Sequence, residues 1–472
     1  MLRKLLSHAV IYGLAAQAPR LAGVATLPII TRYLTPADYG VAGVVTAYAS
    51  VLTMLQSLGM SVVLVNSYAR QPLRYTWVWR QLNGFITVWS AGYGVLVMAA
   101  LYFLIPSEGD GHRLEITLLV GLPIMLFQMT DMQGNLYFQL AQKPLPLAFR
   151  TFVVGVVGVA LNIYTIAYLR LGFMGWFYAN FVAAAVGFML NGYSVYIRQK
   201  LWPIFNFKWY RIRHSLRVSL PVVPHSMAIF MFDTSDRLVL DVLRVPIQRI
   251  GLYNVAASFG TYFLMATMAV SQAASPFYMQ YLAQQHHREA ALQVRRLTFA
   301  LLGLFLFATT LGCLWMREIF QVLIRNEDLQ QAYPLAIVVL MGANYRPMYL
   351  AVFNTLTYRE HTNKLWRISV VAGAGNVLLN FILVPVFGYQ AAAYTTFAAF
   401  MYMGYAGFYM KAYRDSYQVP YYPMVWLALN VLLLVAVYHL ATIAITTKAI
   451  VTALTGAGAI VAALAFRKKL QL

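Results

Sequence analysis

Six charged side chains lie inside stretches of sequence that are otherwise apolar and long enough to cross a bilayer. They are Arg20, Asp131, Asp233, Asp236, Arg237 and Arg346. A charge at membrane depth is costly unless it is paired or faces water. The sequence therefore predicts a protein interior or a water-filled cavity around these residues. Their types indicate two kinds of chemistry, binding of an anion and exchange of a cation.

Two of the six are arginines next to a proline, since Arg20 directly follows one and Arg346 directly precedes one. A proline inside a helix removes a backbone hydrogen bond and frees a carbonyl toward a wet cavity. A guanidinium also matches the acceptor geometry of phosphate. We therefore predict that Arg20 and Arg346 bind an anionic headgroup. The alternative is that both only pair with Asp131 and with the acids near Asp233, and so hold the helices together.

The carboxylates predict ion coupling. A carboxyl group shielded from water suits proton exchange, and Asp131 and Asp233 are therefore candidates for binding a coupling proton or a sodium ion. Static ion pairing is the alternative for both. Asp236 and Arg237 lie nearer the outer end of the same segment, where we predict an ion pair or a gate. Arg32, at the end of the first apolar segment, is placed in the same group.

The sequence contains no recognisable enzymatic motif. It has no glycine-rich phosphate loop with Lys-Ser or Lys-Thr and no His-Glu-x-x-His motif. It also lacks the large external loops expected of a membrane glycosyltransferase or polymerase. Cys313 is the only cysteine, so no disulfide and no thiolate metal site can form within the chain. We predict a protein that is not an enzyme and that uses no cofactor or metal.

Composition shows which elements must position these residues. Of 472 residues, 61% are hydrophobic and 10% are charged, whereas a soluble domain carries about 25% charged residues. The chain is therefore predicted to be an all-α polytopic membrane protein. Because about 20 apolar residues cross a bilayer, we expect about fourteen transmembrane helices. They lie near Leu5–Tyr33, Tyr39–Val65, Gln81–Ile105, Leu114–Leu140, Leu145–Leu169, Phe173–Ile197, Val218–Val242, Gly251–Tyr281, Leu297–Met316, Ala332–Tyr358, Leu365–Phe387, Tyr389–Lys411, Met424–Ala444 and Ala449–Phe466.

The net charge of +21 does not indicate nucleic-acid binding, because most basic residues lie in alternate short loops between the apolar segments. Loops rich in Lys and Arg stay in the cytoplasm, so both termini are expected there. The longest polar loop, Arg198–Arg217, is strongly basic and fits attraction to anionic lipid. Recruitment of an assembly partner is the other interpretation of this loop.

The first twelve segments form two similar halves. The matching positions are Phe149-Arg150 with Trp366-Arg367, Asn162 with Asn380, and Pro36–Gly40 with Ile247–Gly251. Corresponding helices share a direction, so this is a parallel repeat with its axis along the membrane normal; chance similarity of apolar helices is the alternative. We predict two six-helix lobes, at residues 1–197 and 218–411. A linker at residues 198–217 joins them, and two extra helices lie in residues 412–472.

Several motifs resemble those of a known family. In the run Leu27–Gly40, an apolar helix ends in Thr-Arg, and a Leu and then Pro-x-Asp-Tyr-Gly follow. Further along, and in the same order as in that family, come Ser235-Asp236-Arg237, Ile250–Tyr253, Ser275-Pro276-Phe277 and the segment Asn380–Gly388. Over essentially its whole length the chain resembles the polysaccharide transporter family, the Wzx-type flippases.

The resemblance implies the fold of the multidrug and toxin extrusion transporters. It also implies a bacterial inner-membrane flippase that moves undecaprenyl-pyrophosphate-linked oligosaccharides to the outer leaflet by alternating access, for surface polysaccharide synthesis. Membrane lipid is an expected partner, and a polysaccharide polymerase and assembly proteins are further candidates. Two alternatives stay open: a cation-coupled multidrug antiporter of the same fold, and a membrane glycan polymerase or ligase.

Overall fold

The computed structural model of the chain describes residues 22–470, except for 207, 285–286, 360–364 and 416–418. This part is almost entirely helical and contains no β-strand, which confirms the predicted all-α class. It divides into two compact units. Unit 1 comprises the residues up to Gly251 together with Leu323–Asn326, and unit 2 comprises Leu252–Val322 and the residues from Glu327 onward. The predicted lobes, with their linker at residues 198–217, divide the chain differently and stay a prediction.

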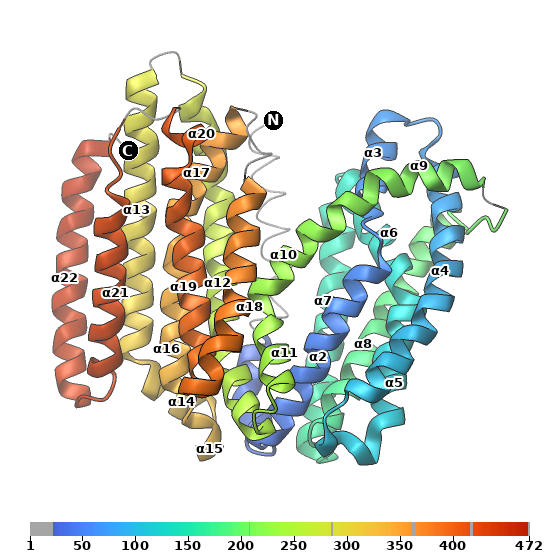
Figure 1. Cartoon of the computed structure of the whole chain (residues 1–472), viewed down its shortest axis with the longest axis horizontal. Helices are drawn as coiled ribbons and strands as arrows, with labels where there is room; N and C mark the ends of the chain where they lie inside the picture. Colours follow the sequence, from blue (N-terminus) through green and yellow to red (C-terminus); the bar gives the residue numbers. More distant parts are fainter. Residues whose placement is uncertain (1–21, 207, 285–286, 360–364, 416–418, 471–472) are drawn as a thin grey trace. The chain divides into compact units, whose positions relative to one another are not determined.

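Unit 1 is a bundle of helices that are interrupted at several points (Figure 1). Residues 22–30 are helical. The elements that follow are α2 (Pro36–Gln56), α3 (Ser61–Arg70), α4 (Tyr75–Leu104), η1 (Ser107–His112), α5 (Arg113–Leu122), η2 (Pro123–Phe127), α6 (Gln128–Leu140), α7 (Pro144–Asn162), η3 (Ile163–Tyr168), α8 (Met174–Gly192), η4 (Tyr193–Arg198), α9 (Trp209–Ser219), η5 (Leu220–Val222), α10 (Val223–Asp233) and α11 (Ser235–Val242). Of the short elements, η2, η3 and η4 are π-helical.

Unit 2 holds the remaining helices, of which α12 begins within unit 1. The elements are α12 (Ile247–Leu282), α13 (His287–Leu314), α14 (Met316–Leu323), α15 (Glu327–Gln330), α16 (Tyr333–Gly342), η6 (Ala343–Tyr345), α17 (Arg346–Tyr358), α18 (Leu365–Phe387), α19 (Ala391–Tyr405), η8 (Ala406–Tyr409), α20 (Lys411–Arg414), α21 (Pro423–Leu440) and α22 (Ile445–Leu470). The last two are the extra helices that lie outside the repeat.

Nine helical segments within the described residues are long and apolar enough to cross a membrane. The chain is therefore a multi-pass membrane protein, as its composition indicated. The expected count of fourteen stays a prediction. Part of the first expected helix falls in residues 1–21, outside the described residues, and α19 has only 15 residues before the 3-10 turn η8.

The segment expected to form one helix at Val218–Val242 is in fact divided, so that expectation was wrong. A 3-10 turn, η5, contains Pro221 and precedes α10, and the chain breaks again at Thr234, whose φ of −141° is not helical. Proline disrupts the hydrogen-bond ladder, and Ser and Thr side chains compete with it. Ser235 donates its hydroxyl to the Met231 carbonyl at 2.5 Å, directly at the second break.

The chain between α8 and α9 is docked along α4 and does not form a loose loop. The amide of Ile204 donates to the carbonyl of Arg80 at 3.0 Å, and Asn83 donates its side-chain amide to the Leu201 carbonyl at 3.4 Å. Gly84 permits this approach, since a Cβ there would lie 2.1 Å from the Ile204 carbonyl oxygen. Residues 201–204 of the predicted linker are thus docked on α4 within unit 1.

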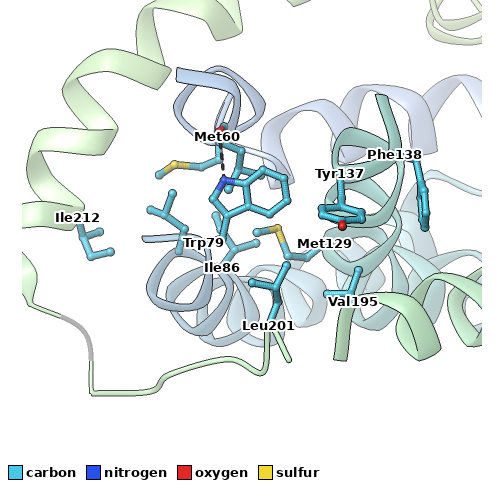
Figure 2. Packing of buried hydrophobic residues seen from close by; sticks show 11 residues of the cluster. Met60, Trp79, Ile86, Met129, Tyr137, Phe138, Val195, Leu201 and Ile212 are labelled. Carbon is cyan, nitrogen blue, oxygen red and sulfur yellow. Dashed lines mark hydrogen bonds between the residues drawn. The ribbon is translucent and has the colours of Figure 1, made fainter. Parts of the chain in front are cut away.

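Helix α9 is held by a buried apolar cluster that also includes residues of α3, α4 and α6 (Figure 2). Trp79 is fully buried in it and donates its indole N–H to the Leu64 carbonyl at 3.1 Å and to the Ser67 hydroxyl at 3.0 Å. Ile212 is the buried member from α9. The basic helix α9 therefore has a fixed orientation on unit 1.

The start of α2 and the start of α12 approach each other closely, and both belong to unit 1. A Cβ on Gly40 would lie 2.2 Å from the carbonyl oxygen of Ile247, and a Cβ on Gly251 would lie 1.7 Å from that of Pro36. Only glycine fits at either position. The family-like motif that ends in Gly40 thus serves packing, and its Asp38 caps α2 through Thr35 and accepts from the Phe173 amide at 3.0 Å.

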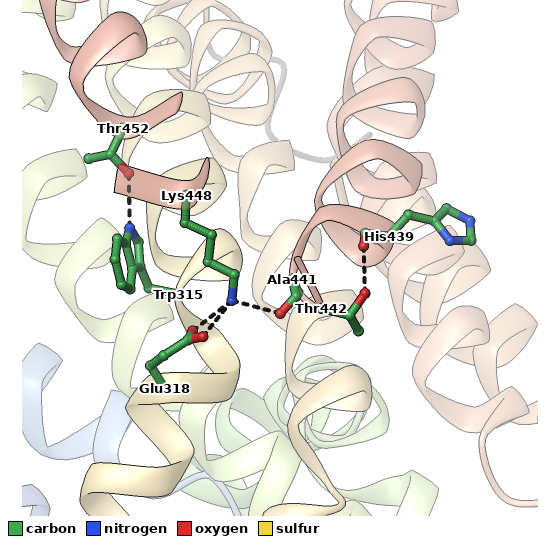
Figure 3. Close-up of polar contacts among 7 residues, drawn as sticks. All are labelled: Trp315, Glu318, His439, Ala441, Thr442, Lys448 and Thr452. Carbon is green, nitrogen blue, oxygen red and sulfur yellow. Dashed lines mark hydrogen bonds and ion pairs between the residues drawn. The ribbon is translucent and has the colours of Figure 1, made fainter. Parts of the chain in front are cut away.

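The extra helices are anchored to unit 2 by an ion pair (Figure 3). Lys448 of α22 is fully buried, and its ammonium lies 2.6 Å and 2.8 Å from the two carboxylate oxygens of Glu318 in α14. It also donates to the Ala441 carbonyl at 2.7 Å. Beside it, the Trp315 indole donates to the Thr452 hydroxyl at 2.9 Å. All three donors of this ammonium therefore have acceptors.

Candidate substrate and ion sites

Arg346 lies at a break in a helix of unit 2. The 3-10 turn η6 separates α16 from α17, and Arg346 is the first residue of α17, with Pro347 as the second. The helix is therefore irregular beside this arginine, and the predicted release of a carbonyl toward a wet cavity stays a prediction. Irregular backbone at membrane depth is tolerated only where it is buried in protein or lines a water-filled cavity.

The guanidinium of Arg346 has only neutral partners among the described residues. Its Nε donates to the Ser271 hydroxyl at 3.3 Å and its Nη1 to the Tyr345 hydroxyl at 3.4 Å, while the side chain is half-buried. No described carboxylate pairs with it. Tyr345 is fixed by stacking on Phe400, with ring centroids 4.9 Å apart and planes 3° from parallel. The positive charge is held in place, and no carboxylate among the described residues neutralises it.

A buried amide fixes the break itself. Asn344 of η6 is fully buried, and its side chain donates to the Thr309 hydroxyl at 2.9 Å and to the Asn430 side-chain oxygen at 3.3 Å. Thr309 lies in α13 and Asn430 in the extra helix α21. The 3-10 turn that positions Arg346 is thus tied to α13, which belongs to the predicted repeat, and to α21, which lies outside it.

Asp131 follows a similar break in unit 1. The π-helical turn η2 begins at Pro123, and Asp131 is the fourth residue of α6, which comes directly after η2. Single π-helical turns are often found at functional sites. Asp131 and Arg346, which the predicted repeat places on corresponding helices, each lie shortly after an irregular turn.

Asp131 belongs to a polar cluster that spans α6, α7 and α8. Its carboxylate accepts from the Asn191 amide at 3.0 Å, and Arg150 donates to the oxygen of that amide at 3.5 Å. Arg150 also donates to the Ser194 hydroxyl, and its guanidinium lies 4.0 Å from the Phe138 ring centroid. This acidic side chain is therefore linked to a cation through one amide.

Sequence reasoning missed Arg150, Asn191 and Asp241 as polar groups inside unit 1. Arg150 is the seventh residue of α7, which begins at Pro144. Asp241 accepts a hydrogen bond from the Tyr48 hydroxyl at 2.8 Å, which joins α11 to α2. Asp241 lies within the predicted seventh segment, so the same search for charges in apolar runs would have found it.

The other predicted site residues are placed as follows. Arg20 lies outside the described residues. Asp233 is the last residue of α10, and Asp236 and Arg237 are buried in the first turn of α11, where neither lacks a partner. Arg32 is exposed in the turn that follows residues 22–30 and forms no ion pair with another described residue. The ion-coupling and gating roles stay predictions.

The two asparagines that match in the predicted repeat have different surroundings. Asn380 of α18 is fully buried and accepts a hydrogen bond from the Thr395 hydroxyl of α19. The side-chain oxygen of Asn162 accepts no hydrogen bond among the described residues. Within the part of the chain that the structure describes, no group of histidine, cysteine and acidic side chains is arranged to hold a metal ion.

Comparison with known sequences gives the family. A family model described as "Polysaccharide biosynthesis protein" matches residues 5–282, more than half of the chain. The chain belongs to this family. No curated protein matches the sequence. Family membership agrees with the resemblance to the polysaccharide transporters.

Comparison with solved structures gives the fold. The lipid II flippase MurJ in an inward closed conformation is similar with a TM-score of 0.65 at 10% identity, covering 92% of this chain and 98% of that chain. The MATE transporter VcmN of Vibrio cholerae has a TM-score of 0.56 at 13% identity, covering 88% and 96%. A MOP superfamily transporter from Pyrococcus furiosus has a TM-score of 0.52 at 14% identity, covering 86% and 94%. The fold is that of the MOP superfamily transporters.

Proposed function

We propose that the protein is a flippase for undecaprenyl-pyrophosphate-linked oligosaccharides in the bacterial inner membrane. It moves the headgroup and sugars from the cytoplasmic to the outer leaflet by alternating access, while the polyprenyl tail stays in lipid. The product then enters synthesis of a surface polysaccharide such as O-antigen, capsule or exopolysaccharide. Membership of a polysaccharide biosynthesis family and the transporter fold support this proposal.

The observation that carries the proposal is the charge of Arg346, which no carboxylate in the described part of the chain compensates. A half-buried guanidinium with only hydroxyl partners has donors left for a bidentate anion such as pyrophosphate. Its position after a helix break fits a wall of a water-filled cavity. Arg20 is the proposed second contact to the phosphates. It lies in the first expected helix, which corresponds to the seventh in the predicted repeat.

A cation-coupled antiporter is the second candidate, and Asp131 favours it. A carboxylate in a transmembrane helix that accepts only one hydrogen bond, from Asn191, retains acceptor sites for a proton, a sodium ion or a cationic substrate. In the flippase proposal the same carboxylate, together with Asp233, couples transport to an ion gradient. The two candidates differ in the charge of what is carried.

Transport in proteoliposomes decides between them. We expect the purified full-length protein to flip an undecaprenyl-pyrophosphate-linked oligosaccharide and not to transport a cationic dye such as ethidium. Arg346→Ala should abolish most flipping. Arg346→Lys should retain part of it, because lysine keeps the positive charge but lacks the planar guanidinium that binds phosphate through two hydrogen bonds. Arg367→Ala, which removes an exposed arginine of unit 2, is the matched control. Dye transport that survives Arg346→Ala and fails in Asp131→Asn would replace the flippase with the antiporter.

A further inference from the structure

The proposed transport makes no use of a cavity on unit 1 between α3, the start of α4 and α9. Its volume is about 830 Å³, and its lining includes Arg70, Arg211, Arg213, His214 and Arg217. No acidic residue lines it. It lies at the basic segment that the distribution of positive charge assigns to the cytoplasmic side.

The charges in this cavity are not neutralised within the described part of the chain. No described carboxylate forms an ion pair with Arg70, Arg213 or Arg217, and all three side chains are exposed. Like charges gathered in one hollow repel each other and raise the local concentration of anions. The cavity therefore has the charge of an anion-binding site.

One of the arginines is already fixed in position. The Arg211 guanidinium lies 4.4 Å from the Trp77 ring centroid, and its Nε donates to the Tyr210 hydroxyl at 2.8 Å. This hydrogen bond lowers the pKa of Tyr210. A guanidinium held by aromatic rings loses little further freedom on binding an anion.

The helix that carries most of the charge cannot rotate away. Ile212 is buried in the apolar cluster of unit 1 (Figure 2). Arg211 and Arg213 on either side of it are exposed. The chain before α9 is fixed to α4 through the Ile204 amide. The cavity is therefore formed by rigid elements, which favours a specific ligand over a diffuse counter-ion cloud.

The cavity also has apolar lining, which identifies the class of anion. Val63, Val78 and Val218 line it together with the arginines. Beside them, Trp209 and Tyr210 are 60% and 63% exposed, and such aromatic side chains are typical of the headgroup layer of a membrane. Phosphate contact together with apolar contact is what an amphiphile requires, and inorganic phosphate supplies only the first.

We propose that this cavity binds the phosphate headgroup of an anionic phospholipid of the cytoplasmic leaflet. The lipid neutralises the arginines and holds α9 in the headgroup layer. This inference does not depend on the flippase proposal, since it concerns a resident membrane lipid and a different set of residues.

The test is binding of short-chain lipids to the full-length protein in detergent, measured by native mass spectrometry. We expect saturable binding of dihexanoyl-phosphatidylglycerol and binding of dihexanoyl-phosphatidylcholine that is about tenfold weaker. The triple variant Arg70→Gln, Arg213→Gln, Arg217→Gln should bind phosphatidylglycerol about 100-fold more weakly, at about fivefold per charge. The corresponding triple lysine variant should retain most of the binding.

The matched control removes three exposed basic residues from unit 2, with the substitutions Arg359→Gln, Arg367→Gln and Lys411→Gln. It should bind phosphatidylglycerol as the unmodified protein does. An equal loss in the control, or equal binding of the two lipids, would show diffuse attraction only and overturn the inference. Displacement of phosphatidylglycerol by undecaprenyl pyrophosphate or inorganic phosphate at much lower concentration would also overturn it. Because the lysine variant keeps the charge, it separates lost binding from misfolding.

Discussion

The two helix breaks that precede Asp131 in unit 1 and Arg346 in unit 2 are built alike but surround opposite charges. Both contain or adjoin a proline, and both are followed directly by a helix that carries the charged residue. At the first break, a chain of hydrogen bonds links Asp131 through Asn191 to the cation Arg150. At the second, Arg346 contacts hydroxyl groups alone.

This difference teaches that two similar irregular turns can present opposite charges. Arg367, the repeat counterpart of Arg150, is exposed, so unit 2 has no copy of the unit 1 cluster at this position. Lys448 provides a reference within unit 2, because it is a buried cation that does have a carboxylate partner. Whether a charge acts in structure or in transport can therefore be tested by comparing these three sites.

The largest effect is expected on stability, at the ion pair between Lys448 and Glu318. Glu318→Ala leaves the Lys448 ammonium buried without its carboxylate, which should lower the free energy of unfolding by about 3–5 kcal/mol. Thermal unfolding in detergent, followed by circular dichroism, measures it. The double variant Glu318→Ala, Lys448→Met removes both charges and should recover most of the stability. If Arg346→Gln destabilises the protein as much as Glu318→Ala does, Arg346 is a structural cation too, and the comparison fails.

The next largest effect is on transport at Arg346. Arg346→Ala removes a charge-assisted hydrogen bond to the substrate, worth about 1.5–3 kcal/mol, so flipping at low substrate should fall by about 10- to 100-fold. The melting temperature should change little, since no ion pair is broken. Initial rates in proteoliposomes measure this, with Arg367→Ala as the control. Unchanged flipping in a folded Arg346→Ala protein would contradict the proposed headgroup contact.

A smaller effect is expected at Asp131. Asp131→Asn keeps the shape and removes the carboxylate charge, at a cost of about 1 kcal/mol or about fivefold in rate. If Asp131 couples transport to an ion, the variant should also lose the dependence of rate on pH or on sodium. Flipping rates across a series of pH values and sodium concentrations test this. A variant that responds to both as the unmodified protein does would leave Asp131 a structural partner of Asn191.

The smallest effect is expected at Tyr345. Tyr345→Phe removes the hydroxyl that Arg346 contacts at 3.4 Å but keeps the ring stacked on Phe400. Because a hydrogen bond of that length is weak, we expect a change below about 1 kcal/mol, seen as a rise of less than about fivefold in the KM for substrate. A fall in kcat as large as that of Arg346→Ala would mean that Tyr345 contacts the substrate itself.

The sequence was sufficient for the fold class and for the helix break at Arg346, because hydropathy and proline act locally. It also led to the correct family, through motifs such as Pro36–Gly40 that have a packing role. It was not sufficient for partners. Asn191 lies 60 residues from Asp131, and nothing in either neighbourhood indicates that they meet. Long-range contacts of this kind are set by tertiary packing.

The chain between α8 and α9 shows a second limit of prediction from sequence. A polar, basic stretch between two apolar segments has the composition of a loop, and it was interpreted as a linker. Its order comes from backbone groups, namely the Ile204 amide and the Leu201 carbonyl, and from the missing side chain of Gly84. Such backbone contacts cannot be predicted from the types of the residues that make them. The charges on α9 could be seen in advance, but the cavity that they line could not.

The close approach of α2 and α12 at Gly40 and Gly251 is symmetric under the predicted repeat. In the repeat alignment Pro36 corresponds to Ile247 and Gly40 to Gly251, and the structure sets Gly40 against Ile247 and Gly251 against Pro36. The counterpart of each residue thus contacts the counterpart of its partner, which is the form of contact that two identical chains make about a two-fold axis. The close approach therefore has the form of a symmetric dimer interface, made here within one polypeptide.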